Sequence, residues 1–166
     1  MRATPPGWPR ISCSVFYEDP AQAIDWLTQA FGFEVRLKIV GEGGRIEHSE
    51  LVYGEGLVFV GGAGAANTHP ERAFPASPKR VGDRNTQALC IFVDDADAHC
   101  AQAREAGARI EMEPTTTDHG VDYWTDRCYL AVDPEGHRWW FMQRAARFST
   151  PALGMRAYGS RPARTP

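Results

Sequence analysis

A histidine and a glutamate stand two residues apart in a β-prone stretch, at His48 and Glu50. Side chains at positions i and i+2 of a strand point to the same face, so the two groups can meet. An imidazole beside a carboxylate can transfer protons or hold a ligand by hydrogen bonds, which makes His48 and Glu50 the candidate catalytic residues. The pair could instead form an unusual metal site, or a polar stripe on a solvent-facing edge. Leu51 and Tyr53 fit a face packed under a helix, which turns His48 and Glu50 to the opposite face.

The other reactive residues form no familiar catalytic motif. The sequence contains no Ser-His-Asp arrangement, phosphate-binding loop or nucleic-acid signature. Asp118 and His119 lie in a polar loop that could gate a cavity or could simply be mobile. His69 and His99 are predicted to be solvated, and His137 follows a turn, where we expect a local role.

Four cysteines stand at positions 13, 90, 100 and 128, and no two of them have CxxC spacing. A cytosolic chain of this length does not need disulfides, so all four are predicted to be reduced thiols. The same spacing disfavours a zinc ion held by paired thiolates.

These residues lie in a sequence that repeats once. A β-prone run at 11–17 is followed by an amphipathic stretch and a second β-prone run at 33–37. The same order returns at 87–93 and 108–112, so each half reads strand, helix, strand. Helix signals support this interpretation, because Asp19 and Asp95 suit N-caps, with Pro20 in the first helical turn and Gly32 and Gly107 at the ends.

Each half continues with two more strands joined by a tight turn, Gly54–Gly56 in the first half and Asp133–Gly136 in the second. Both halves therefore read βαβββ, and the fold class is predicted to be α+β. The expected units are a first module at 10–61, a connector at 62–85, a second module at 86–143 and an arginine-rich tail at 144–166. The tail could be an arm onto a partner or a solvated terminus.

This tandem βαβββ repeat resembles the vicinal oxygen chelate superfamily, which includes glyoxalase I, bleomycin-resistance proteins and extradiol dioxygenases. The resemblance covers about residues 10–143 and rests on the strand-Glu18-Asp19-Pro20-helix opening, on 32–35, on His48-Ser-Glu-Leu51 followed by Gly54-Glu-Gly56, and on 133–141. It implies two modules that form a curved mixed sheet around a cavity, in a protein that is commonly a dimer.

In the metal-using members of this family, four ligands come from the first and last strands of each module. The resemblance places these positions at Ser12, Phe59, Ala88 and Trp140. Phe, Ala and Trp side chains cannot bind a divalent cation, and a neutral Ser alone is a poor ligand. The sequence therefore predicts no metal and no cofactor, and the metal-free drug-binding members are the closest functional analogues.

Strand alternation predicts an aromatic lining for the cavity. Phe59 and Trp140 occupy equivalent places in the two modules, so the sequence predicts them as opposed walls around one central volume. The predicted ligand-binding residues are Ser14, Phe59, Trp124, Arg138 and Trp140. Such a lining suits a planar organic molecule, with Trp124 near the mouth and Arg138 meeting an anionic or carbonyl group.

Three functions are open at this point. The first is a binding protein that sequesters a small planar molecule such as an antibiotic. The second is a metal-independent isomerase, lyase or cyclase that uses His48, Glu50 or Arg138. The third is a non-catalytic protein whose aromatic side chains fill the cavity.

Composition and charge limit the kinds of binding partner that we expect. The 166 residues carry a formal net charge of −3, which gives no field for holding nucleic acid or an acidic membrane. The longest apolar run is short for a membrane span, and the N-terminus has no apolar core of the kind a secretion signal needs. We therefore expect a cytoplasmic homodimer with a small-molecule ligand and no nucleic-acid or membrane partner.

Overall fold

The structure, a computed structural model, describes residues 2–68, 71, 75–120 and 124–146. Its elements follow the order expected for two βαβββ modules. The first module holds β1 (Cys13–Tyr17), α1 (Pro20–Phe31), β2 (Glu34–Val40), β3 (Ile46–Tyr53) and β4 (Gly56–Gly62). The second holds β5 (Leu89–Phe92), α2 (Ala96–Glu105), β6 (Arg109–Asp118), β7 (Thr125–Val132) and β8 (Arg138–Ala146), and three short 3₁₀ turns occupy Glu42–Gly44, Gly64–Ala66 and Pro78–Val81.

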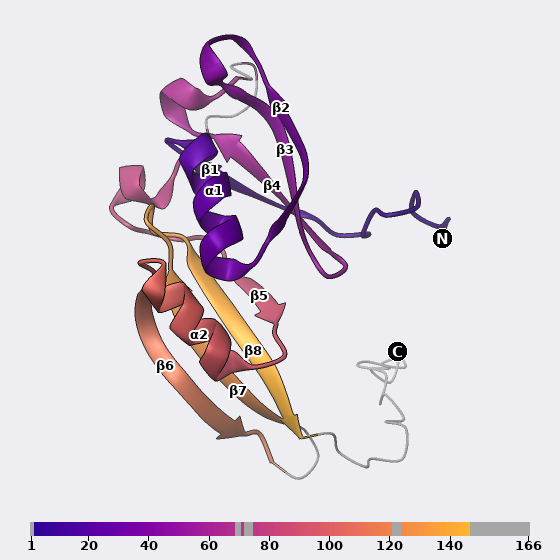
Figure 1. The fold of residues 1–166 in the computed structure, drawn as a ribbon, viewed down its shortest axis with the longest axis vertical. Helices are drawn as coiled ribbons and strands as arrows, with labels where there is room; N and C mark the ends of the chain where they lie inside the picture. Colours follow the sequence, from indigo (N-terminus) through magenta and orange to yellow (C-terminus); the bar gives the residue numbers. More distant parts are fainter. Residues whose placement is uncertain (1, 69–70, 72–74, 121–123, 147–166) are drawn as a thin grey trace, which may run out of the picture.

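The strands form two four-stranded mixed sheets, in the orders β1-β4-β3-β2 and β5-β8-β7-β6 (Figure 1). In each sheet the first and last strands of the module are parallel neighbours, and the other pairings are antiparallel. The two-module α+β fold is therefore confirmed. The strands form two curved sheets, one per module.

Both helices begin where the sequence predicts. Asp19 accepts a hydrogen bond from the backbone N–H of Gln22 at 3.0 Å, and Asp95 does the same for Asp97 and Ala98. Gly32 ends α1 with a φ of 74°, a left-handed conformation that glycine adopts without strain. These caps fix the direction in which each helix crosses its sheet.

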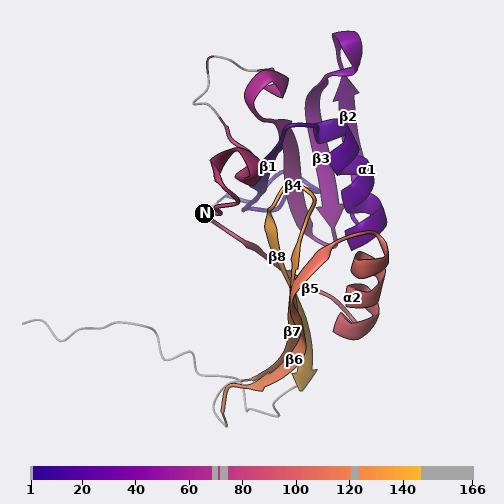
Figure 2. The same cartoon turned by 90° about the vertical axis from the view of Figure 1, so that its left-hand side faces the viewer.

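The two modules share one hydrophobic core, because both helices cover the same side of the sheets and lie next to each other (Figure 2). The Phe31 ring at the end of α1 packs against β8, 5.5 Å from the Trp139 ring and 4.7 Å from the Phe141 ring. The Trp26 indole N–H donates to the carbonyl of Ala106, the C-cap residue of α2, at 2.8 Å. The first module therefore completes its core with side chains of the second.

The turn between β7 and β8 joins the two modules. The buried Asp133 carboxylate accepts hydrogen bonds from the Tyr17 hydroxyl of β1 at 2.6 Å and from the Trp139 indole at 3.1 Å. Glu135 accepts the backbone N–H groups of Glu18 and Asp19 at 2.8 and 3.1 Å. Burial alone would raise the pKa of Asp133, but the neighbouring His137, together with the hydrogen bonds from Tyr17 and Trp139, outweighs burial and leaves this pKa below its usual value.

The prediction of a solvated His99 was wrong. Its ring is half-buried between the modules, with Nε2 3.1 Å from the Phe31 carbonyl oxygen and the ring centroid 4.3 Å from that of Phe141. Burial lowers the pKa of His99. The end of α1 covers this ring, since the Phe31 ring stacks on it with the centroids 6.2 Å apart, and periodicity along α2 alone does not reveal that contact. His69 lies outside the described residues.

The side of each sheet away from the helices carries a different set of residues, which we call the open face. Alternation along the strands puts His48 and Glu50 on the open face of the first sheet, opposite the buried Leu51, as predicted. The open face of the second sheet carries Cys90, Cys128, Leu130, Trp140 and Met142.

None of the four cysteines forms a disulfide, in agreement with the sequence. Among the described residues, no helix is long and apolar enough to cross a membrane. The tail beyond residue 146 lies outside the described part of the chain. The tail is predicted from the sequence to begin at Arg144, but this residue belongs to β8 and pairs with Asp126 at 3.0 Å.

Candidate functional site

A groove of about 480 Å³ lies on the open face of the first sheet. Strands β1, β3 and β4 form its floor, and the start of the connector forms one side. Of the predicted site residues, it brings together Ser14, His48 and Phe59. The lining also includes Phe16, Ile46, Glu47, Asn67, Thr68 and Pro75. Its volume is in the range of small-molecule sites.

Next to this groove, the second candidate catalytic residue, Glu50, is buried and paired on both sides. One carboxylate oxygen lies 2.7 Å from Nε of Arg36, and the other lies 2.9 Å from Nε2 of His48. The hydrogen bond with His48 and the contact with Arg36 lower the pKa of Glu50, against the opposing effect of burial. The pair is therefore part of a triad, Arg36–Glu50–His48, in which His48 and Glu50 stand on the inner strand β3 and Arg36 on the edge strand β2.

Sequence reasoning missed Arg36. The ladder between β2 and β3 shifts register between Val35 and Leu37, so Arg36 sits in a bulge. A bulge re-aims the side chain of the extra residue, and here the guanidinium reaches Glu50 on the open face. Strand alternation alone cannot reveal such a shift, and no signal in the sequence announces it.

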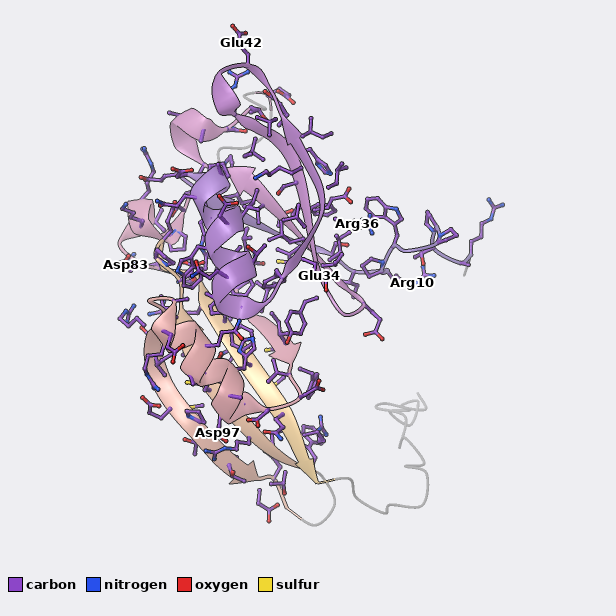
Figure 3. All side chains as sticks on the ribbon, viewed as in Figure 1. Arg10, Glu34, Arg36, Glu42, Asp83 and Asp97 are labelled. Atoms are coloured by element: carbon purple, nitrogen blue, oxygen red, sulfur yellow. The ribbon has the colours of Figure 1, made fainter. Side chains whose placement is uncertain are left out.

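The N-terminal segment also contributes to the open face, and sequence reasoning missed it as well. The Arg36 guanidinium lies 4.4 Å above the Trp8 ring and donates to the Gly7 carbonyl. The Trp8 ring lies 6.4 Å from the Phe59 ring. Figure 3 shows Arg36 at the side of the first sheet from which the N-terminal segment projects. A tryptophan between prolines, in 5–9, was the available signal.

The predicted site residues of the second module lie apart from this groove. Trp140 lies on the open face of the second sheet, paired with Cys90 and Leu130 on the neighbouring strands. Its register position matches that of Phe59, which pairs with Ser14 in the first sheet. Within one chain, the structure therefore gives Phe59 and Trp140 equivalent positions without bringing them into the same groove.

Arg138 has partners of its own. Its guanidinium forms two hydrogen bonds with Glu111, at 2.9 and 3.0 Å, and a third with the Asp83 carbonyl at 3.2 Å. It lines a hollow of about 370 Å³ between the modules that also includes Ser14. Trp124 packs at the far end of the second sheet, 5.5 Å from the His119 ring and 5.0 Å from the Arg144 guanidinium.

No metal centre is assembled by the residues that the structure describes, since no three His, Cys, Asp or Glu side chains among them come together. Ser12 and Ala88, the positions that the resemblance assigned to ligands, are exposed residues just ahead of β1 and β5. Glu50 already has two partners, one of them a cation. The chemistry available at the groove is therefore stacking on Phe59 and hydrogen bonding to polar groups such as His48.

Comparison with a family model and with solved structures agrees with the two-module fold. The model described as Glyoxalase/Bleomycin resistance protein/Dioxygenase superfamily matches residues 11–141. Comparison with curated protein sequences finds no significant match.

Among solved structures, the chain is similar to TioX from Micromonospora sp. ML1, with 30% identity and a TM-score of 0.61 over 80% of this chain and 97% of that one. It is similar to TnmS3, an antibiotic binding protein from Streptomyces sp. CB03234, with 19% identity and a TM-score of 0.56 over 82% and 97% of the two chains. A virulence protein from Salmonella typhimurium gives 15% identity and a TM-score of 0.58 over 82% and 97%.

Proposed function

Because the chain belongs to the glyoxalase/bleomycin resistance protein/dioxygenase superfamily, we propose that it binds a small planar organic molecule in the groove of the first module. The observation that carries the proposal is the groove itself, about 480 Å³ in volume with the Phe59 ring on its wall. An aromatic wall offers a flat ligand both buried apolar area and a stacking face. The ligand is held and released unchanged, in a site without metal or cofactor.

The chemistry of the ligand is that of a planar antibiotic. TnmS3, which shares the fold, is an antibiotic binding protein, and this supports the choice. Sequestration is a function that needs only affinity for the ligand. It therefore does not require a metal ion at the family's metal-ligand positions, where this chain has Ser12, Phe59, Ala88 and Trp140.

The proposal includes a homodimer in which the second copy completes the site. Large apolar side chains are exposed on the open faces, including Leu37 and Ile39 on the first sheet and Phe92 on the second, the last with 54% of its surface exposed. Patches of this kind mark interaction surfaces. If the open face of the first sheet meets that of the second sheet of a partner, Phe59 and the partner's Trp140 become opposed walls.

The test combines binding and mass. Fluorescence titration of the protein with a panel of planar aromatic antibiotics should show saturable quenching, and Phe59→Ala and Trp140→Ala should each weaken binding by about 1–3 kcal/mol while the protein stays folded. Light scattering should give the mass of a dimer. Absence of any saturable ligand in the panel, or binding that is indifferent to Phe59, would refute the proposal.

An enzyme is the second candidate, favoured by one observation, the 2.9 Å contact between His48 and Glu50. A carboxylate that orients an imidazole is an arrangement that proton-transfer enzymes use. The two functions differ in the fate of the ligand. Chromatography of the bound molecule after long incubation should return it unchanged if the protein sequesters, and a new product would favour the enzyme.

A further inference from the structure

The carboxylate of Glu50 is held in a fixed position beneath His48. Each of its oxygens has one charged or polar partner, Arg36 Nε at 2.7 Å and His48 Nε2 at 2.9 Å. Arg36 is itself fixed, because its guanidinium stacks on Trp8 and donates to the Gly7 carbonyl. The chain of contacts from Trp8 to His48 therefore leaves Glu50 little freedom to turn.

This arrangement selects one form of the imidazole. A carboxylate can only accept hydrogen bonds, so Nε2 of His48 carries the proton in the contact with Glu50. In a neutral imidazole the other nitrogen, Nδ1, then has a lone pair. In the part of the chain that the structure describes, Nδ1 has no hydrogen-bonding partner.

The lone pair is available to a ligand in the groove. His48 lines the groove, its side chain is 42% exposed, and its ring lies 5.7 Å from the ring of Phe59. A flat molecule stacked on Phe59 thus has one edge beside the imidazole. A donor at that edge gains a hydrogen bond to Nδ1, whereas an acceptor there meets a second lone pair and leaves both groups unsatisfied.

We infer that the Glu50–His48 pair makes the groove selective for planar ligands that carry a hydrogen-bond donor, a ring hydroxyl or ring N–H, at the edge facing His48. The inference rests on the proposed function of the groove and names the class of ligand it takes. His48 touches the ligand, while Glu50 and Arg36 act through His48 as positioning residues. Discrimination of this kind works by refusing the wrong partner as much as by binding the right one.

The experiment compares two probes of nearly equal shape, 6-hydroxyquinoline and 6-methoxyquinoline, by calorimetric or ligand-detected NMR titration at pH 7.5. In the unaltered protein the hydroxy probe should bind about tenfold more tightly, the scale of one hydrogen bond gained or lost. His48→Phe keeps a ring against Phe59 but removes both nitrogens, so the two probes should then bind equally.

Glu50→Gln should abolish the preference. The Gln carbonyl can accept from Arg36, and its NH₂ group must then donate to Nε2 of His48. The imidazole proton moves to Nδ1, and since a hydroxyl oxygen and a methoxy oxygen can both accept from Nδ1–H, the two probes should bind equally. Glu47→Gln is the matched control, because Glu47 lines the same groove but pairs with Arg45, and it should leave the ratio of the two affinities unchanged.

The outcomes separate the two proposals. Equal binding of the probes to the unaltered protein, with binding lost in Phe59→Ala, would overturn the selectivity and leave the proposed function standing. Binding of neither probe at millimolar concentration would overturn both. A preference for the hydroxy probe that survives His48→Phe would also overturn the inference. Thermal unfolding of each variant confirms that the protein is folded during the titration.

Discussion

The open faces of the two sheets have the same backbone and different chemistry. Equivalent strands pair in equivalent register, and the ladder shifts at matching places, beside Arg36 in β2 and beside Glu111 in β6. Yet the positions that hold His48 and Glu50 in β3 correspond to Cys128 and Leu130 in β7, two residues without a charge. The repeat supplies two copies of a scaffold, and a polar triad has been built on one of them.

The two hairpin turns differ in the same way. The turn at Asp133–Gly136 enters the other module and binds Tyr17, Glu18 and Asp19. The matching turn at Gly54–Gly56 is exposed. The contacts that these turns make between the modules are therefore one-sided, and stability should depend more on the second module's turn than on the first's.

The largest effect is expected at a core position that holds a small side chain in the first module and a large one in the second. Trp139 in β8 and Val58 in β4 occupy equivalent register positions, and both are buried. Trp139→Ala should lower the free energy of unfolding by about 3–5 kcal/mol, because Trp139 packs on Phe31 and Phe33 of the other module. Val58→Ala should cost about 2 kcal/mol or less. Urea unfolding followed by circular dichroism measures both losses of stability. Equal losses in the two variants would contradict the larger role given to Trp139.

Next in size is the joint at Asp133. Asp133→Asn should cost about 2–3 kcal/mol, because a charged acceptor for Tyr17 and Trp139 is lost, and Tyr17→Phe about 1 kcal/mol. The double variant should cost less than the sum, since both changes remove one shared contact. Glu55→Gln, in the exposed turn of the first module, is the control and should change stability by no more than about 0.5 kcal/mol. Strict additivity would show that the two groups do not interact.

The same joint predicts a dependence on pH. The pKa of Asp133 is lower in the folded chain than the value of about 3.9 for an unfolded aspartate. Its stabilising contribution is therefore complete above the unfolded pKa and is lost as the pH falls through the folded one. The difference in unfolding free energy between the unaltered protein and Asp133→Asn should be large at pH 6 and should shrink below about pH 4. If this difference instead grew on acidification, the predicted direction of the pH dependence would be wrong.

A smaller effect is expected at the two bulges. Arg36→Gln leaves the buried Glu50 with His48 alone and should cost about 1–2 kcal/mol. Glu111→Gln breaks exposed ion pairs with Arg109 and Arg138 and should change stability by no more than about 0.5 kcal/mol. Thermal or urea unfolding at low and physiological salt measures the stability change of both variants. Equal responses would mean that Glu50 gains nothing from Arg36 beyond an exposed pair.

The smallest effect concerns the open face of the second sheet. Cys90 is exposed beside Trp140, so a second copy that covers this face should slow its reaction with iodoacetamide severalfold as the protein concentration rises. Cys100 is the internal control, because burial raises the pKa of its thiol and keeps it unreactive at every concentration. A Cys90 rate that is independent of concentration would count against the proposed dimer.

The sequence allowed the fold to be predicted because its signals are local. Helix caps such as Asp19 and Gly32, and the turn that begins at Asp133, act within a few residues and leave a readable pattern. Alternation also placed His48 and Glu50 on the correct face. Phe59 lines a groove of the first module, whereas its predicted role as a wall opposite Trp140 in one cavity stays a prediction.

The parts that escaped prediction depend on contacts between distant segments. Arg36 reaches Glu50 through a bulge, Trp8 reaches Phe59 from the N-terminal segment, and Glu111 engages Arg138. His99 is half-buried because a neighbouring helix covers it. None of these follows from periodicity, which describes one element at a time and not what lies against it.

The hydrogen bond between Tyr17 and Asp133 spans 116 residues, and this has a consequence for synthesis on the ribosome. At about 5–20 residues per second, roughly 6–23 seconds separate the appearance of the first partner from that of the second. Throughout this interval Phe31 and Phe33 lack Trp139, the side chain that covers them in the finished protein. The nascent first module therefore keeps part of its apolar surface exposed, and its core is completed only after β8 has been translated.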